Sequence, residues 1–301
     1  MANPDILYSI RNLTVEYQTR HGVVKGVDDV SLDIRRGEIL GLVGESGSGK
    51  STLGKAMMRL RNGSARITAG ELWFDGQDLM KLSERQMRDL RGSRLGMVFQ
   101  DPMTSLNPVQ RIVEHLTETM LTHEPEWTEE EARERAENLV ERLGIRRERV
   151  KDYPHQMSGG MRQRVMIALA LALNCDLVIA DEPTTSLDVI VEAKFLDLLK
   201  ELRDEFNDVF EKPLHPYTEG LLKSVPNIEL DSGALYKMQG SPPDLSSPPS
   251  GCRFHPRCPY MMEEVCPVYE PPFERPEGAS EDCRVACWLH HPHPQKVAIG
   301  A

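Results

Sequence analysis

The chain has 301 residues, of which 40% are hydrophobic and 28% charged, and its formal net charge is −11. This length fits one large domain or two ordinary ones. The acidic balance argues against a protein that coats nucleic acid, because phosphate contacts need clustered Lys and Arg. The longest apolar run, residues 165–175, is about half of a membrane span. The first residues do not form a secretory signal, so we expect a cytosolic protein.

Two alternating segments rich in β-branched residues, 6–17 and 23–34, predict antiparallel strands, with Gly22 near the turn between them. Residues 38–44 form a continuous apolar run, which is typical of a strand buried on both faces. This run leads into a Gly-rich loop and then a helical pattern, so a strand, a loop and a helix are predicted in order.

Capping-box patterns open two helices, one at Ser83 with Gln86 and one at Thr128 with Glu131. Residues 104–157 therefore indicate a mostly helical insertion.

Residues 177–181 form a second apolar run that predicts a buried strand, and a helix is expected over 189–206. From Pro242 onward the chain is rich in Pro and Cys and has little periodicity. That segment needs something other than a large apolar core to hold it together.

Residues 44–51, GESGSGKS, match the phosphate-loop pattern G-x-x-x-x-G-K-[ST] in full. Its glycines let backbone N–H groups wrap a phosphate chain at the start of the next helix. Lys50 supplies a charge for the outer phosphates, and the Ser51 hydroxyl suits Mg²⁺. The alternative, an ordinary Gly-rich turn, is disfavoured by the strand before it and the helix after it. The residues expected to bind nucleotide here are Gly44, Glu45, Ser46, Gly47, Ser48, Gly49, Lys50, Ser51 and Thr52.

Asp181 and Glu182 end the second apolar run. In a phosphate-loop enzyme, an acidic residue at this strand end holds Mg²⁺. A neighbouring carboxylate can orient or deprotonate the attacking water. Without the loop a solvated strand end would be the better interpretation; together the two motifs predict nucleotide hydrolysis.

A second Gly-rich helix start, residues 157–164, contains Ser158, Gly159 and Gly160. A hydroxyl and free N–H groups at a helix N-terminus suit a phosphate. Since the first loop already serves the nucleotide of its own site, the alternative is a plain helix start.

The order and spacing of these motifs over residues 6–206 resemble the ATP-binding subunits of ABC transporters. The fold class expected is α/β, with a phosphate-loop (RecA-like) nucleotide-binding core, an antiparallel β lobe, a helical insertion and a Cys-rich C-terminal extension. The resemblance implies an ATPase that uses ATP and Mg²⁺ and is coupled to solute translocation. The signature loop, Ser158 to Gly160, would close over ATP held by another subunit.

Further positions match the same family. Gln100 looks like the Q-loop glutamine, which contacts Mg²⁺ and water, so Gln100 and Glu182 are the expected catalytic residues. Tyr17 looks like the aromatic residue that stacks on adenine, and residues 186–188 look like the D-loop. By itself each of Gln100 and Tyr17 would be taken as structural.

The subfamily resemblance rests on residues 100–108, 181–189, 215–222 and 251–260, which look like the dipeptide/oligopeptide importer ATPases, a group with relatives in nickel uptake. It implies an ABC domain over residues 1–206 and a transporter-type extension over 207–301. The expected partners are integral-membrane permease subunits, a second and non-identical ATP-binding subunit, and indirectly an extracytoplasmic solute-binding protein, but no nucleic acid. The expected location is the cytoplasmic face of the cell membrane, as a peripheral subunit.

Five of the six cysteines lie between Cys252 and Cys287, and Cys175 is most simply a small buried residue. In a reducing compartment such clustering favours a metal over disulfides. Four thiolates suit Zn²⁺ or a [4Fe–4S] cluster. The resemblance favours the cluster, with Cys283 as a substitute for Cys287, while unmetallated cysteines in a loose tail remain an alternative. The expected ligands are Cys252, Cys258, Cys266 and Cys287.

In this family a core strand and a switch-loop histidine follow the D-loop helix, and that histidine contacts the γ-phosphate. Here the helix ending at Phe206 runs directly into the tail, to which His215 belongs. We therefore predict that some tens of residues are absent at about 205–208. Their loss would expose apolar faces of the sheet and slow hydrolysis while ATP binding survives.

Two other functions stay open. The chain could be a hydrolysis-impaired nucleotide-binding remnant of the family, or a soluble ABC ATPase that acts on nucleic acid. The acidic balance and the C-terminal position of the cysteines disfavour the second.

Overall fold

The computed structural model describes residues 5–20, 22–60, 63–100, 105–182, 213–223, 238–279 and 283–294. The D-loop residues 186–188, the helix predicted for 189–206 and the junction at about 205–208 lie outside the described residues. The chain divides into two compact units, Met1–Asp204 and Glu205–Ala301, and each is described by itself.

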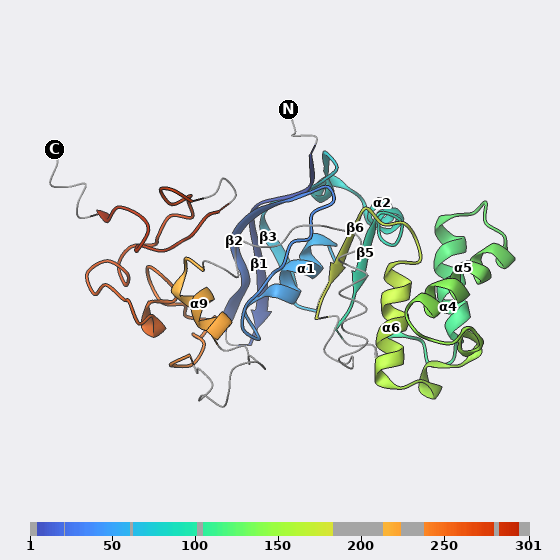
Figure 1. Ribbon diagram of the computed structural model, residues 1–301. Coiled ribbons are helices and arrows are strands. Elements are labelled where there is room, and N and C mark those ends of the chain that lie inside the picture. Colours follow the sequence, from blue (N-terminus) through green and yellow to red (C-terminus); the bar gives the residue numbers. More distant parts are fainter. Residues whose placement is uncertain are drawn as a thin grey trace. The chain divides into compact units, whose positions relative to one another are not determined.

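An antiparallel sheet opens the first unit. Strands β1 (Ile6–Thr19) and β2 (Gly22–Arg35) pair as a hairpin, which confirms the two predicted strands. With β3 (Ala65–Phe74) and the short β4 (Gln77–Asp78) they form a sheet of order β2-β1-β3-β4 (Figure 1). Alternation of apolar and polar residues gives this sheet one face that is buried in the core.

Gly70 sits at an irregularity of this sheet. The register of β1 and β3 shifts between Arg11 and Thr14, and Gly70 adopts a φ of 98° beside the shift. A Cβ on Gly70 would lie 2.5 Å from the Leu13 Cα and 2.6 Å from the Asn12 carbonyl oxygen. The bulge therefore needs a residue without a side chain.

We expect Gly70→Ala to lower the free energy of unfolding by about 2–4 kcal/mol, because backbone strain and a clash with backbone atoms add together. The control is Gly76→Ala: Gly76 has a φ of 75°, but its added Cβ would meet nothing within 4 Å. This control should lose about 1–2 kcal/mol from strain alone. Urea titration of both variants measures their free energies of unfolding. Equal losses of stability would show that the clash at Gly70 adds nothing to the backbone strain.

Helix α1 (Lys50–Met57) packs its apolar face against the antiparallel sheet. The phenol of Tyr8, on β1, donates a 2.6 Å hydrogen bond to the Met57 carbonyl at the end of this helix. Burial raises the pKa of Tyr8, so the phenol stays protonated and remains a donor. The helix that follows the Gly-rich loop is thereby fixed to the β lobe.

A second, parallel sheet consists of β5 (Leu95–Val98) and β6 (Leu177–Ala180). The strand predicted at 177–181 is confirmed, but its residues alternate between half-buried and exposed, so its predicted full burial is wrong. The strand predicted over residues 38–44 is also wrong. That run is irregular, and Leu40, Leu42 and Val43 are 46%, 50% and 67% exposed. Among the described residues neither segment has strands on both sides to cover it.

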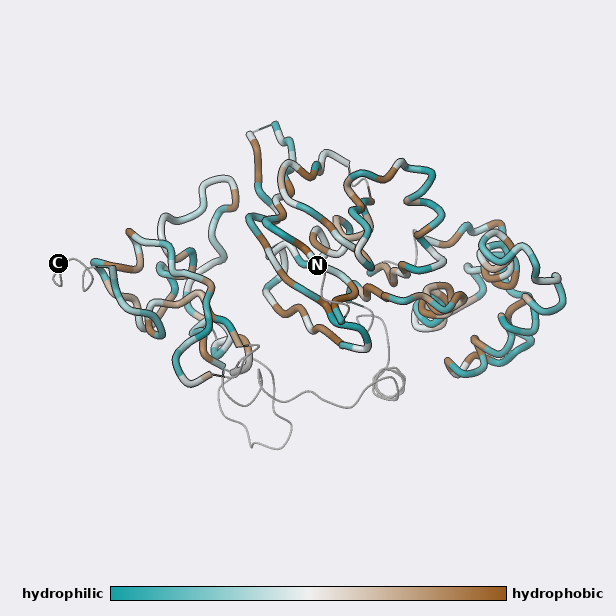
Figure 2. Tube along the Cα trace, turned by 90° about the horizontal axis from the view of Figure 1, so that it is seen from above, coloured by the Kyte–Doolittle hydropathy of each residue, from teal (hydrophilic) through white to brown (hydrophobic). Residues whose placement is uncertain are grey.

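The helical region forms a second core. Helices α4 (Ile112–His123), α5 (Glu129–Arg142) and α6 (Gly159–Ala170) pack together, and Figure 1 shows them on the side of the β5–β6 pair away from the antiparallel sheet. Both predicted capping boxes are present, at α2 (Glu84–Leu90) and at α5. Short 3-10 turns span Leu79–Lys81, Arg147–Lys151 and Pro154–Gln156. Along these helices and the strands, apolar and polar stretches alternate (Figure 2).

The second unit has little regular structure in its described part. Helix α9 (Pro216–Lys223) and a 3-10 turn, His255–Arg257, are its regular elements there. The Nδ1 atom of His215 accepts a 3.0 Å hydrogen bond from the Tyr217 N–H, and the ring contacts Phe254. His215 is therefore part of the packing of the second unit. Within the described ranges, no helix is long and apolar enough to cross a bilayer.

Candidate functional site

The Gly-rich loop before α1 has the geometry that a phosphate cradle needs. Gly47 and Gly49 adopt φ values of 80° and 99°, which suit glycine. The Lys50 ammonium lies inside the loop and donates to the carbonyls of Gly44, at 2.8 Å, and Glu45, at 2.9 Å. The cation is therefore held where the N–H groups at the start of the helix also concentrate positive charge.

The loop is also shaped by a close approach of the β lobe. A Cβ on Gly49 would lie 2.1 Å from the Gly26 carbonyl oxygen, and a Cβ on Gly26 would lie 2.6 Å from the Tyr17 ring. Gly26 was not predicted as a site residue. Its single signal in the sequence is a glycine inside a strand, which often marks a close backbone approach.

Ser51 and Asp181 meet although 130 positions separate them in the chain. The Ser51 hydroxyl donates to Oδ1 of Asp181 at 2.7 Å. Asp181 is 7% exposed, and its Oδ2 atom is buried without a hydrogen-bond partner among the described residues. A buried carboxylate oxygen without a donor is a site for a cation. Ser51 and Asp181 therefore fit Mg²⁺, which when bound neutralises phosphate charge.

Gln100 and Glu182 meet at the ends of the two parallel strands. The Gln100 amide donates to Oε2 of Glu182 at 2.6 Å, and both residues are exposed. Glu182 has a φ of 47°, an uncommon conformation for a residue with a side chain. The two predicted catalytic residues are thus neighbours next to the Ser51–Asp181 pair, although their roles stay predictions.

Tyr17 lies at the end of β1, where its hydroxyl and the Thr52 hydroxyl form a 2.8 Å hydrogen bond. Both residues line a cavity of about 320 Å³ between the β lobe and α1, together with Lys55 and Arg66. The structure brings Tyr17 to the helix that follows the phosphate loop. Stacking of Tyr17 on adenine remains a prediction.

The second Gly-rich helix start is confirmed as the beginning of α6. Ser158 is the N-cap residue, and its hydroxyl accepts a hydrogen bond from the Met161 N–H at 3.3 Å. Gly159 and Gly160 form the first turn of the helix. Binding of a partner's nucleotide by this helix start remains a prediction.

The predicted ligand cysteines are neighbours in the second unit. The Cys252 N–H donates to the Cys266 carbonyl at 2.8 Å. Burial is the main cause that raises the pKa of the Cys252, Cys258 and Cys287 thiols, and charge repulsion among these cysteines and Cys266 adds to it. The cysteines are nonetheless not arranged as a coordination site: the described part of the chain holds no group of three or more His, Cys, Asp or Glu side chains that could bind a metal ion.

Cys175, outside this group, is half-buried. Its thiol donates to the Gly92 carbonyl at 3.2 Å, and burial raises its pKa to about 11. It therefore behaves as a small packed residue, close to what the sequence indicated.

Comparison with known families matches both units. Residues 27–185 match the family model of the ABC transporter, and residues 203–266 match the C-terminal region of the oligopeptide/dipeptide transporter. A solved dimeric ATP-binding cassette in a post-hydrolysis state with ADP and Pi is 30% identical with a TM-score of 0.61, over 65% of this chain and 82% of that one. The ABC ATPase fold is therefore confirmed.

Two similar relatives extend over nearly the whole chain. The dipeptide transport ATP-binding protein DppD of Bacillus subtilis is 40% identical, and the alignment covers 97% of each chain. The oligopeptide transport ATP-binding protein OppD of Escherichia coli is 39% identical over 93% of each. The first alignment runs over 329 positions, whereas 97% of 301 residues is about 292, so about 37 positions have no residue of this chain. The chain belongs to the ATP-binding subunits of ABC transporters, in the group that carries the oligopeptide/dipeptide transporter C-terminal region.

Proposed function

We propose that this chain is the ATP-binding and ATP-hydrolysing subunit that energises the import of di- or oligopeptides. The meeting of Ser51 with Asp181 directly beside the Lys50 loop carries the ATP part of this proposal, and the match of residues 203–266 to the oligopeptide/dipeptide transporter region supports the peptide part. Nickel import is the alternative within the same group, because specificity rests with the binding protein and the permease rather than with this chain.

The chain's own residues have distinct tasks in this function. The loop N–H groups and Lys50 bind the phosphates of ATP. Ser51 and Asp181 would hold Mg²⁺, and Glu182, oriented by Gln100, would take the proton of the attacking water. Tyr17 stacks on the base.

The partners follow from the same assignment. The helix start at Ser158 acts on ATP held by a second, non-identical ATP-binding subunit, so the working unit is a heterodimer. Both subunits dock on integral-membrane permease subunits at the cytoplasmic face of the membrane, and an extracytoplasmic binding protein delivers the solute to the permease. The dimeric state of the solved cassette that this chain resembles supports the pairing of subunits.

Lys50→Ala tests the site. We expect it to weaken ATP binding by about 100-fold, since it removes the cation that faces the outer phosphates from a loop that otherwise keeps its shape. The control is Lys151→Ala, which removes the same charge from an exposed position in the helical region. Binding of a fluorescent ATP analogue to the full chain measures both variants. Unchanged affinity in Lys50→Ala would reject the site.

We also propose that some tens of residues, with a core strand and the switch-loop histidine, are missing at about 205–208. The excess length of the alignment supports this proposal, and so does the exposure of Leu40, Leu42 and Val43. The chain would then bind ATP but hydrolyse it slowly. Sequencing of the coding DNA across Leu202–Val209 is a direct test, because intervening codons would contradict a natural deletion.

In the second unit, we propose that Cys252, Cys258, Cys266 and Cys287 hold a [4Fe–4S] cluster, or Zn²⁺ as the alternative. The gathering of these four cysteines in one loop-rich segment supports the ligand set, although their side chains in the described part of the chain are not arranged as a coordination site. Anaerobically purified protein should contain iron with a broad visible absorption, and Cys258→Ser should lose it while Cys283→Ser keeps it. Loss in both variants would contradict this ligand set.

A further inference from the structure

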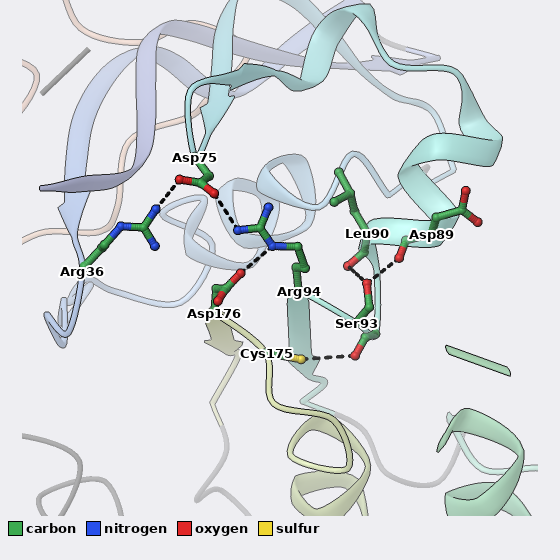
Figure 3. A network of polar contacts seen from close by, with 9 residues as sticks. Arg36, Asp75, Asp89, Leu90, Ser93, Arg94, Cys175 and Asp176 are labelled. Carbon is green, nitrogen blue, oxygen red and sulfur yellow. Dashed lines mark hydrogen bonds and ion pairs between the residues drawn. The ribbon is translucent and has the colours of Figure 1, made fainter. Parts of the chain in front are cut away.

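A cluster of four charged side chains joins the two sheets of the first unit at the end away from the nucleotide loop. The Arg94 guanidinium donates through Nη2 to Asp75 at 2.7 Å and through Nε to Asp176 at 2.5 Å. Asp75 also accepts a hydrogen bond from Arg36, so its carboxylate lies between two guanidinium groups (Figure 3). We name these four residues the arginine–aspartate clamp.

The clamp ties four strands together through their ends. Arg36 directly follows β2, and Asp75 lies in the turn between β3 and β4. Arg94 directly precedes β5, and Asp176 directly precedes β6. One guanidinium therefore connects the antiparallel lobe, which carries Tyr17, with both strands of the parallel sheet.

The backbone of Arg94 acts at the same place as its side chain. Its carbonyl accepts hydrogen bonds from the Asp176 N–H, at 2.9 Å, and the Leu177 N–H, at 3.1 Å. The guanidinium also lies over the ring of Phe74, with the two centres 4.8 Å apart, and Phe74 is fully buried in the first core. Arg94 is thus held by its contact with Phe74, by its ion pairs and by the backbone hydrogen bonds that begin the pairing of β5 with β6.

The register that begins at Arg94 ends at the nucleotide site. The strands pair in order from Leu95 with Leu177 to Val98 with Ala180, and the Asp181 N–H then donates to the Val98 carbonyl at 2.9 Å. Shifting this register by one residue would turn every side chain to the opposite face. It would separate Asp181 from Ser51.

Two-stranded sheets are marginal by themselves, and no described strand covers the far edge of β6. Contacts at the ends of β5 and β6 therefore contribute more to holding their register than such contacts would in a wide sheet. We propose that Arg94 is a positioning residue, which holds β5 and β6 in register through Asp75 and Asp176 and thereby places Asp181 for Mg²⁺·ATP.

The charges of the clamp predict how loss of Arg94 would act on the two strands. The hydrogen bond from Arg94 is the main cause that lowers the pKa of Asp75, so the Asp75 carboxylate is charged at neutral pH. Without Arg94, the Asp75 and Asp176 carboxylates would repel each other across the joint between the lobe and the sheet. Each ion pair is half-exposed and contributes little alone, so the effect belongs to the network rather than to one pair.

The experiment compares ATP affinity of the full chain with Mg²⁺ and with EDTA, and its Mg²⁺ arm rests on the proposed function. We expect Arg94→Met to reduce the Mg²⁺-dependent gain in affinity by about tenfold, the size of coupling within a network, while affinity in EDTA stays within about twofold. The triple variant Asp75→Asn, Arg94→Met, Asp176→Asn should regain part of the loss, since no like charges remain. The control Arg147→Met breaks a pair of similar exposure, Arg147–Glu141, in the helical region and should change nothing.

A second readout needs no nucleotide. Hydrogen exchange of the amides from Leu177 to Asp181 should be faster in Arg94→Met than in Arg147→Met. Equal exchange, or an unchanged Mg²⁺-dependent gain, would overturn the proposal. If the wild type binds no ATP, the proposed function fails, while the exchange result still decides the role of Arg94.

Discussion

Insertion of the segment that we propose to be missing is expected to raise the ATP turnover of this chain by about 10²–10³-fold, because one lost transition-state contact typically has an effect of this size. The donor is the corresponding strand and switch-loop segment of B. subtilis DppD, a relative that is 40% identical, and it is inserted after Phe206. The restored strand should also cover the apolar run at 38–44, whose Leu42 is 50% exposed, and raise the free energy of unfolding. Phosphate release at saturating ATP and urea titration measure the two effects.

Two controls distinguish the effect of the inserted strand and histidine from the effect of added chain length. An insertion of equal length made of Gly and Ser should restore neither turnover nor stability, because it supplies neither a strand nor a histidine. Glu182→Gln in the restored chain should abolish the gain, since the water then lacks its base. If the chain without the insertion already turns over ATP as fast as the restored one, and Glu182→Gln stops it, the proposed impairment is wrong.

The second large effect is expected at Asp181. Asp181→Asn should weaken the Mg²⁺-dependent part of ATP binding by about 10–100-fold, the range typical for loss of a group that supports a metal. The amide still accepts the Ser51 hydroxyl, but the negative charge is gone from Oδ2, which is buried and has no hydrogen-bond partner in the described part of the chain. Titration of the fluorescent ATP analogue with Mg²⁺ and with EDTA separates this part from the Lys50 contribution.

Asp89→Asn is the matched control, because Asp89 is an exposed aspartate of α2 with no role at the loop. It should bind Mg²⁺·ATP like the wild type. A Mg²⁺-dependent gain that falls by this factor in Asp181→Asn and stays unchanged in Asp89→Asn is the expected result; a full Mg²⁺-dependent gain in Asp181→Asn would exclude Asp181 from the metal site.

Local sequence rules were sufficient for several elements. The hairpin of β1 and β2 follows from alternation and a turn glycine, and helices α2 and α5 follow from their capping boxes. The phosphate loop follows from glycines at positions that need positive φ. In each case, the residues that determine the structure are only a few positions apart.

The tertiary structure decided what depends on distant partners. Residues 38–44 have the composition of a buried strand, but a strand exists only where neighbouring strands supply hydrogen bonds and cover its faces. The pairing of Ser51 with Asp181 and the clamp around Arg94 likewise join segments far apart in the chain. The sequence by itself determined the phosphate loop and the family, because those patterns are contiguous. Only the fold decided which strands are covered and which charges meet, because packing and long-range hydrogen bonds set both.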